Sequence, residues 1–175
     1  MKKILVFACG LGLLVGACSN PTQENGQRIE ELNGLLRGAS TTEEMIAFAQ
    51  EQNGLILDQL ANAQNMEDTT RYAMLIQGAK CGRALKEFDQ SIGFYEELVR
   101  DFPEAEFTPK AYFLSGFIYE NDLQDLGKAD SLYSLVISKY PDNELADQAR
   151  ILKEQLGIPL EDIIRKFQEQ NKELK

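Results

Sequence analysis

An internal repeat of 38 residues constrains the fold of this chain more than any other feature. Shifting residues 73–111 onto residues 111–149 superimposes several identical residues, among them Gly78 on Gly116, Leu85 on Leu123, Tyr95 on Tyr133, Pro103 on Pro141 and Glu106 on Glu144. Chance seldom aligns prolines, glycines and aromatic residues at one offset. A period of this length is typical of stacked helical units, in which each unit buries its apolar face against the next.

The residues that recur in the repeat suit a pair of antiparallel helices. Gly116 and Ala129 are small and allow two helices to approach closely, while Pro141 ends the second helix because proline cannot continue the hydrogen-bond ladder. Tyrosines fill the space around the small residues. We expect the first copy to use the equivalent positions Met74, Gly78, Cys81, Ser91 and Tyr95.

Residues 111–141 resemble the tetratricopeptide repeat at Tyr112, Gly116, Tyr119, Ala129, Tyr133 and Pro141. The longer segment 113–167 is similar to the C-terminal part of small tetratricopeptide-repeat outer-membrane lipoproteins that are common in Bacteroidota. More distantly, the arrangement resembles lipoproteins of the barrel-assembly machinery and coordinators of the Tol system. The resemblance implies an all-α fold, a short solenoid of antiparallel helix pairs that binds proteins and does not catalyse a reaction.

The repeats account for the second half of an all-helical domain that we place at residues 28–175. The repeats cover about 71–108 and 109–146, a half repeat follows at 144–156, and a terminal helix at 159–172 has an apolar stripe. We expect this helix to cap the solenoid, because solenoid ends expose an apolar face. Whether it also fills the groove is left open by the sequence.

Before the repeats, helical periodicity predicts a helix from Arg28 that stops near Gly38. Two overlapping capping boxes, Ser40 with Glu43 and Thr41 with Glu44, predict the start of the next helix. That helix should bury Met45, Ile46, Phe48 and Ala49. The pair Asn53-Gly54 leaves open whether residues 43–64 form one helix or two.

The N-terminal segment has the pattern of a lipoprotein signal peptide at residues 1–17. Two lysines precede an apolar run that is too short to span a bilayer, and Val15-Gly16-Ala17-Cys18 resembles the bacterial lipobox. The resemblance implies that Cys18 carries lipid, with palmitate-type acyl chains. The alternative is ordinary cleavage after Ala17 that leaves a free thiol. Residues 18–27 are polar and predict a flexible lipidated tether.

The predicted location is the bacterial outer membrane, anchored by lipid. Ser19 stands where an aspartate would signal inner-membrane retention in enteric bacteria, and no acidic cluster of the kind that marks surface export follows Cys18. Both features favour the periplasmic face, with the cell surface as the alternative.

Composition excludes several functions. The chain has 28 acidic and 18 basic residues for a net charge of −10, so no basic face for nucleic acid is evident. It has no histidine, which removes the commonest general base and the usual zinc ligand. The mature chain keeps one cysteine, Cys81, which we expect to be a small core residue. We predict no enzyme activity, no metal and no cofactor.

Partner binding is predicted on the inner face of the first helix of each pair. The candidate residues are Tyr72, Arg83, Lys110, Phe113, Phe117, Asn121 and Gln148, with Leu75, Ala79, Ile151 and Gln155 at equivalent places. Phe113 and Phe117 suit apolar anchors for a peptide or helix, and the alternative is that they pack on neighbouring helices.

The sequence therefore predicts a membrane-anchored scaffold or adaptor in the bacterial cell envelope. Its partners would be one or more envelope proteins, whose identity the sequence does not give, and it leaves the oligomeric state open. Two alternatives stay open: a structural lipoprotein without a groove ligand, and an accessory glycan-binding or enzymatic envelope protein.

Overall fold

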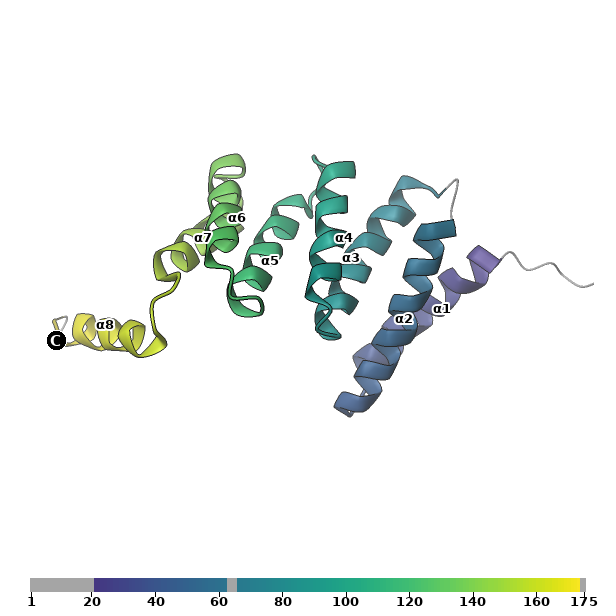
Figure 1. Cartoon of the computed structure of the whole chain (residues 1–175), viewed down its shortest axis with the longest axis horizontal. Helices are drawn as coiled ribbons and strands as arrows, with labels where there is room; N and C mark the ends of the chain where they lie inside the picture. Colours follow the sequence, from purple (N-terminus) through teal and green to yellow (C-terminus); the bar gives the residue numbers. More distant parts are fainter. Residues whose placement is uncertain (1–20, 63–65, 174–175) are drawn as a thin grey trace, which may run out of the picture.

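The computed structural model describes residues 21–62 and 66–173, which fold into eight helices without a strand. Figure 1 shows the helices following one another along the long axis of the molecule, from α1 at one end to α8 at the other. They are α1 (Pro21–Gly38), α2 (Thr42–Asn62), α3 (Asp68–Ala84), α4 (Phe88–Asp101), α5 (Thr108–Asn121), α6 (Leu126–Lys139), α7 (Glu144–Gln155) and α8 (Leu160–Glu173).

The helices from α1 to α7 form a continuous stack of antiparallel pairs. Each packs against the next one along the chain, and α5 also contacts α7. Buried apolar side chains form two clusters, one across α1 to α5 and one across α5 to α7. The predicted all-α solenoid is confirmed, and α1 with α2 adds a pair before the two repeats found in the sequence.

The prediction of a flexible tether is wrong for residues 21–27, because α1 already begins at Pro21. Proline suits the first turn of a helix, where its missing N–H would have no partner, and Glu24 adds a favourable acidic charge in that turn. The Asn25 amide also donates to Asp58 Oδ2 on α2 at 3.3 Å. The signal peptide, Cys18 and the first residues of the tether lie outside the described residues.

The open question about residues 43–64 is settled as far as Asn62, because α2 runs through Asn53-Gly54 without a break. The Asn53 side chain is 5% exposed and donates to Gln90 Oε1 of α4 at 2.7 Å, which anchors this part of the helix. At the start of α2, Thr41 and Glu44 form the predicted capping box, since the Glu44 N–H donates to Thr41 Oγ1 and the Glu44 carboxylate accepts from the Thr41 N–H.

Two residues predicted to be buried on α2 are exposed. Met45 and Ile46 keep 43% and 41% of their surface accessible, whereas Ala49 is buried. Further along α2 the buried positions are shared by Ile56 and polar residues, among them Gln52 and Gln59. The buried face of α2 is therefore partly polar.

The glycine of each repeat lies where an aromatic ring of the second helix packs on the first. A Cβ on Gly116 would lie 2.9 Å from the Tyr133 ring, and a Cβ on Gly78 would lie 2.8 Å from the Phe94 ring. The contact of Gly78 with Phe94 corrects the expected equivalence of Tyr95 and Tyr133, which the 38-residue offset pairs. In the first repeat Phe94 fills the notch, and Tyr95 points elsewhere.

The C-terminal helix forms where it was predicted but extends away from the stack. Gly157 adopts a left-handed φ of +74°, and Pro159 precedes α8, so the chain changes direction between α7 and α8. Figure 1 shows α8 beyond α7 rather than across it, and α8 has no extensive packing partner among the described helices. Ile164, an apolar residue of this helix, is 47% exposed. The terminal helix therefore does not fill the groove.

None of the helices in the described ranges is both long enough and apolar enough to cross a membrane.

Candidate functional site

The first helices of the pairs line up along one side of the stack, and we call this surface the first-helix face. It is defined by accessible residues of α1, α3, α5 and α7: Glu30, Asn33, Thr70, Ala73, Gln77, Arg83, Lys110, Asn121, Gln148 and Ile151. Contacts between side chains of α3 and α5, and packing of α5 on α7, keep this surface continuous.

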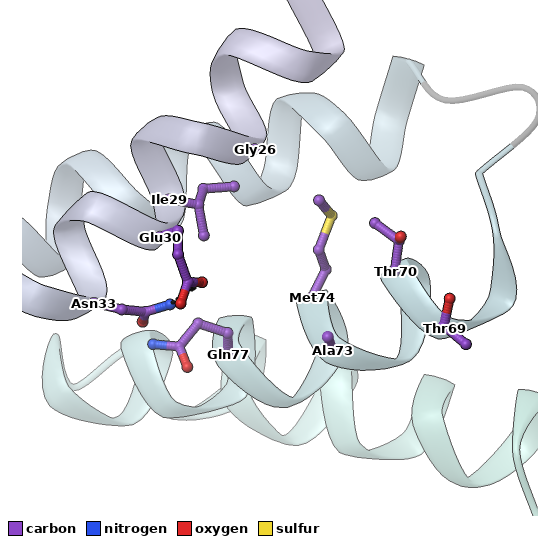
Figure 2. A pocket seen from close by; sticks show the side chains of 9 residues that line it. All are labelled: Gly26, Ile29, Glu30, Asn33, Thr69, Thr70, Ala73, Met74 and Gln77. Carbon is purple, nitrogen blue, oxygen red and sulfur yellow. Dashed lines mark hydrogen bonds between the residues drawn. The ribbon is translucent and has the colours of Figure 1, made fainter.

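A pocket of about 470 Å³ lies between α1 and α3, and we call it the α1–α3 pocket. Figure 2 shows that α1 contributes one wall and α3 the other, with their side chains facing each other. Its apolar part is formed by Ile29 and Met74, which are almost completely buried. Its polar part consists of Glu30, Asn33, Thr69, Thr70 and Gln77.

The repeat explains why the pocket is open. Ala73, Ala111 and Ala149 occupy the same position in successive first helices. Ala111 and Ala149 are completely buried, whereas Ala73 is exposed and lines the pocket. Because α1 does not pack closely on α3, the position that is sealed in the later repeats remains accessible here.

A buried glutamine holds the polar wall in place. Gln52 of α2 is completely buried, and its Nε2 donates to Asn33 Oδ1 at 2.9 Å and to the Ile29 carbonyl at 3.1 Å. Its Oε1 accepts from Gln77 Nε2 at 2.9 Å. Asn33 and Gln77 are thus preorganised by one residue, which reduces the entropy lost when a ligand binds. Glu30 is the charged residue of the lining, which favours a neutral or cationic ligand.

Two predicted residues meet at a second pocket, of about 390 Å³, formed by α3 and the starts of α5 and α7. Tyr72 and Lys110 line it with Glu106, Phe107, Asn143, Glu144 and Leu145. The Tyr72 hydroxyl accepts from the Phe107 N–H at 3.2 Å, and its ring packs edge-on against Phe102. Tyr72 is therefore held in the fold, while Lys110 is exposed with its ammonium 5.6 Å from the Phe107 ring centroid.

Three further predicted residues gather where α3 and α5 end. The Arg83 guanidinium lies over the Phe117 ring at 4.9 Å and 3.7 Å from Asp122 Oδ2. Asn121 donates to the Phe117 carbonyl at 3.1 Å and so satisfies the end of α5. The Phe117 ring is covered by the arginine, which removes it as a fully open apolar anchor.

Phe113 is not a surface anchor, and its prediction as one is wrong. It is 9% exposed, with its ring centroid 5.7 Å from that of Tyr133 in the cluster across α5 to α7. Leu75 and Ala79 are likewise completely buried. Gln148 and Ile151 are exposed on α7, where they stand apart from the two pockets.

Cys81 is buried next to Gln52. No cluster of three potential metal ligands occurs among the described residues. Burial raises the pKa of the Cys81 thiol to about 11, and its Sγ donates to Gln52 Oε1 at 3.0 Å. At neutral pH the thiol is protonated and enclosed, so it is not a nucleophile.

The contribution of α1 to the face was missed by sequence reasoning. The repeat register starts at residue 73, and α1 has no matching glycine or proline signature. Only helical periodicity marked α1 as a helix. Nothing in that pattern shows that Glu30 and Asn33 stand opposite Thr70 and Gln77.

Comparison with known proteins agrees with this architecture. A comparison with curated proteins gave no significant match. Residues 110–143 match the model of the tetratricopeptide repeat family, whose members are generally non-enzymatic scaffolds for protein–protein interaction. The matched segment comprises α5, α6 and the turn before α7. The chain is therefore an all-α solenoid of tetratricopeptide type, with a tetratricopeptide repeat at residues 110–143.

Proposed function

We propose that the protein is a lipid-anchored scaffold of the bacterial cell envelope that holds another envelope protein along its first-helix face. The observation that carries the scaffold role is the α1–α3 pocket, which is open, preorganised by Gln52 and continuous with the first-helix face. The tetratricopeptide match supports the same role. The proposed location of the protein rests on the sequence pattern around Cys18, which favours the periplasmic face of the outer membrane.

Site-specific photo-crosslinking in the native membranes tests the scaffold role. A photoreactive amino acid at Thr70, on the rim of the α1–α3 pocket, should capture a distinct protein. The same amino acid at Ser131, exposed on α6, is the matched control and should capture little. Equal capture at both positions, or none at Thr70, would contradict the proposal and favour a structural lipoprotein without a groove ligand.

A second pair of variants distinguishes the pocket from the rest of the surface. Ala73→Phe places a ring in the α1–α3 pocket, while Ala47→Phe adds the same ring to an exposed position of α2. Because partner affinity depends on a few residues that fill pockets, we expect Ala73→Phe to reduce capture of the partner about tenfold or more. The Ala47→Phe protein should bind normally.

The anchor is tested by Cys18→Ala in cells supplied with a labelled fatty acid. The wild-type chain should take up the label and remain with the outer membrane, and the variant should do neither. Protection from protease in intact cells would support the periplasmic face. An unlabelled wild-type chain that begins at Cys18 would instead indicate ordinary cleavage after Ala17.

A further inference from the structure

A separate cavity of about 240 Å³ is lined by residues of α4, α5 and α6, and we call it the α4–α6 cavity. Its apolar lining comes from Ile92 and Val99 of α4, Tyr112 and Tyr119 of α5, and Leu132 of α6. None of the residues assigned to the first-helix face lines it. It therefore lies on the side of the stack formed by the second helices.

Two almost completely buried residues that carry hydroxyl groups, Tyr95 and Ser115, line this cavity. Tyr95 is 2% exposed and Ser115 is 4% exposed, and neither side chain forms a hydrogen bond within the described part of the chain. In that part the one fully enclosed polar side-chain atom without a partner is Asn53 Oδ1. The hydroxyls of Tyr95 and Ser115 are not among such enclosed atoms, and both residues line the cavity.

The repeat shows why the Tyr95 hydroxyl is unpaired. In the second repeat the Tyr133 hydroxyl donates to Glu120 Oε2 at 2.6 Å. The residue 38 positions before Glu120 is Gly82, which has no side chain to accept a hydrogen bond. Burial also raises the pKa of Tyr95 to about 12, so at neutral pH its hydroxyl remains both donor and acceptor. An unpaired buried hydroxyl is unfavourable, and a ligand with a polar group would satisfy it.

The size of the cavity selects the occupant. At about 240 Å³ it is smaller than the roughly 300–1,000 Å³ of most small-molecule pockets, yet larger than the about 150 Å³ void that holds a benzene ring. Its rim carries Arg100, which pairs with Asp101, and Glu96, which has no ion pair among the described residues. A basic group beside the occupant would pair with Glu96.

We propose that the α4–α6 cavity receives one tyrosine or tryptophan side chain from a basic segment of the protein that the scaffold holds. This inference rests on the proposed scaffold function, because the partner supplies the side chain. Tyrosine and tryptophan combine an apolar ring with a polar tip, and they are enriched among the residues that dominate protein interfaces. The ring fills the apolar lining, and its polar tip pairs with the hydroxyls of Tyr95 and Ser115.

Tryptophan fluorescence tests the proposal, because the chain itself contains no tryptophan. The probes are the capped tripeptides Lys-Trp-Lys and Glu-Trp-Glu, added to the purified full chain. Transfer of indole into the cavity should shift the Lys-Trp-Lys emission to shorter wavelength and saturate. Glu-Trp-Glu should bind about fivefold more weakly or worse, because its charges oppose Glu96. Absence of a saturable shift, or equal binding of both peptides, would overturn the proposal.

Matched variants locate the bound peptide. Tyr95→Phe keeps the ring and removes one hydroxyl, so binding of Lys-Trp-Lys should weaken about fivefold. Tyr133→Phe removes the equivalent hydroxyl of the other repeat and should leave binding unchanged. Ser115→Leu should abolish binding by filling the cavity, and circular dichroism verifies its fold. Equal loss in both tyrosine variants would contradict the site.

The result is independent of the crosslinking experiment. Peptide binding is measured on the purified chain, and crosslinking at Thr70 is measured on the opposite helices in native membranes. If Thr70 captures a partner while Lys-Trp-Lys does not bind, the scaffold function stands and the aromatic site fails. If the peptide binds while Thr70 captures nothing, the first-helix face is not the docking surface.

Discussion

Gln52 joins three helices in the N-terminal half of the stack. It is completely buried on α2 and forms hydrogen bonds with Ile29 and Asn33 of α1 and with Gln77 and Cys81 of α3. A glutamine side chain has two donor hydrogens and an acceptor oxygen, and here both ends are used. One polar side chain thus links three helices and shapes the α1–α3 pocket.

Replacement of Gln52 by leucine should lower the free energy of unfolding by about 2–3 kcal/mol, because Asn33 and Gln77 would be left without their partner. Gln50→Leu, at an exposed position of the same helix, is the control and should change stability by less than about 0.5 kcal/mol. Urea denaturation followed by circular dichroism measures both. Equal midpoints for the two variants would show that the hydrogen bonds of Gln52 contribute nothing net.

At the scale of the element, the packing of α5 on α6 requires glycine at one position, whereas α4 contains a glycine that its packing does not require. Gly116 faces Tyr133, whereas Gly93 of α4 has no atom within 4 Å of the place where a Cβ would stand. Both lie inside helices, where alanine is intrinsically preferred to glycine. The same substitution should therefore have opposite signs at the two positions.

Gly116→Ala should destabilise the protein by about 1–3 kcal/mol, because its Cβ would press on the Tyr133 ring and on the Leu132 side chain. Gly93→Ala should stabilise it by about 0.5–1 kcal/mol. Thermal unfolding of the two single variants provides the comparison. A Gly116→Ala protein as stable as wild type would mean that α5 and α6 can move apart without loss of stability.

Pairing of α3 with α4 also depends on charge. Arg71 of α3 bonds with Glu97 and with Asp101 of α4, the latter at 2.9 Å, and all three side chains are about three-quarters buried. Hydrogen bonds from Arg100 and Arg71 hold the pKa of Asp101 below its ordinary value of 3.8. Since the lowered pKa belongs to the folded state, the stabilisation is present above pH 3.8 and is lost as the pH falls through the folded-state pKa.

Arg71→Met should therefore lower the free energy of unfolding at pH 7 by about 1 kcal/mol. The difference from wild type should shrink as the pH falls below 3.8 and Asp101 becomes protonated. Arg100→Met should have a smaller effect, because that side chain is 67% exposed and screened by solvent. Denaturation curves across this pH range measure the difference. A gap that stays constant with pH would show that packing of Arg71, not its charge, is responsible.

The stack is built to be continuous from α1 to α7, and α8 stands outside it. Each helix of the stack buries side chains in one of the two apolar clusters or in contacts with its neighbours. A solenoid of this kind is stabilised by nearest-neighbour contacts. Removal of one helix should therefore lower the free energy of unfolding only by the contribution of that helix's own contacts.

Ending the chain after Gly157 removes α8 and should shift the melting temperature by no more than about 2 °C. Ending it after Asn143 removes α7 as well and uncovers the cluster that contains Tyr133 and Val136, so the loss should be large. Thermal circular dichroism compares the two. A loss of more than about 5 °C for the shorter truncation would indicate that α8 folds back onto α7 as a cap in solution.

Much of the fold could be predicted from the sequence because the signals that define it are local or periodic. The glycines, the prolines and the apolar periodicity fixed the positions of α3 to α7, and Gly157 with Pro159 placed the start of α8. The accessibility of the candidate partner-binding residues could not be predicted in the same way. Phe113 and Phe117 look alike in the sequence, yet one is buried against Tyr133 and the other lies beneath Arg83.

What the sequence determined by itself is the unit, a pair of helices with a glycine notch and a proline stop, because backbone sterics act within a few residues. What only the tertiary structure decided is how the units meet. Ala73 is exposed where Ala111 is buried, Phe94 rather than Tyr95 fills the Gly78 notch, and α8 leaves the stack. These outcomes depend on the distance and angle between neighbouring pairs, which follow from the packing of many side chains and not from any single motif.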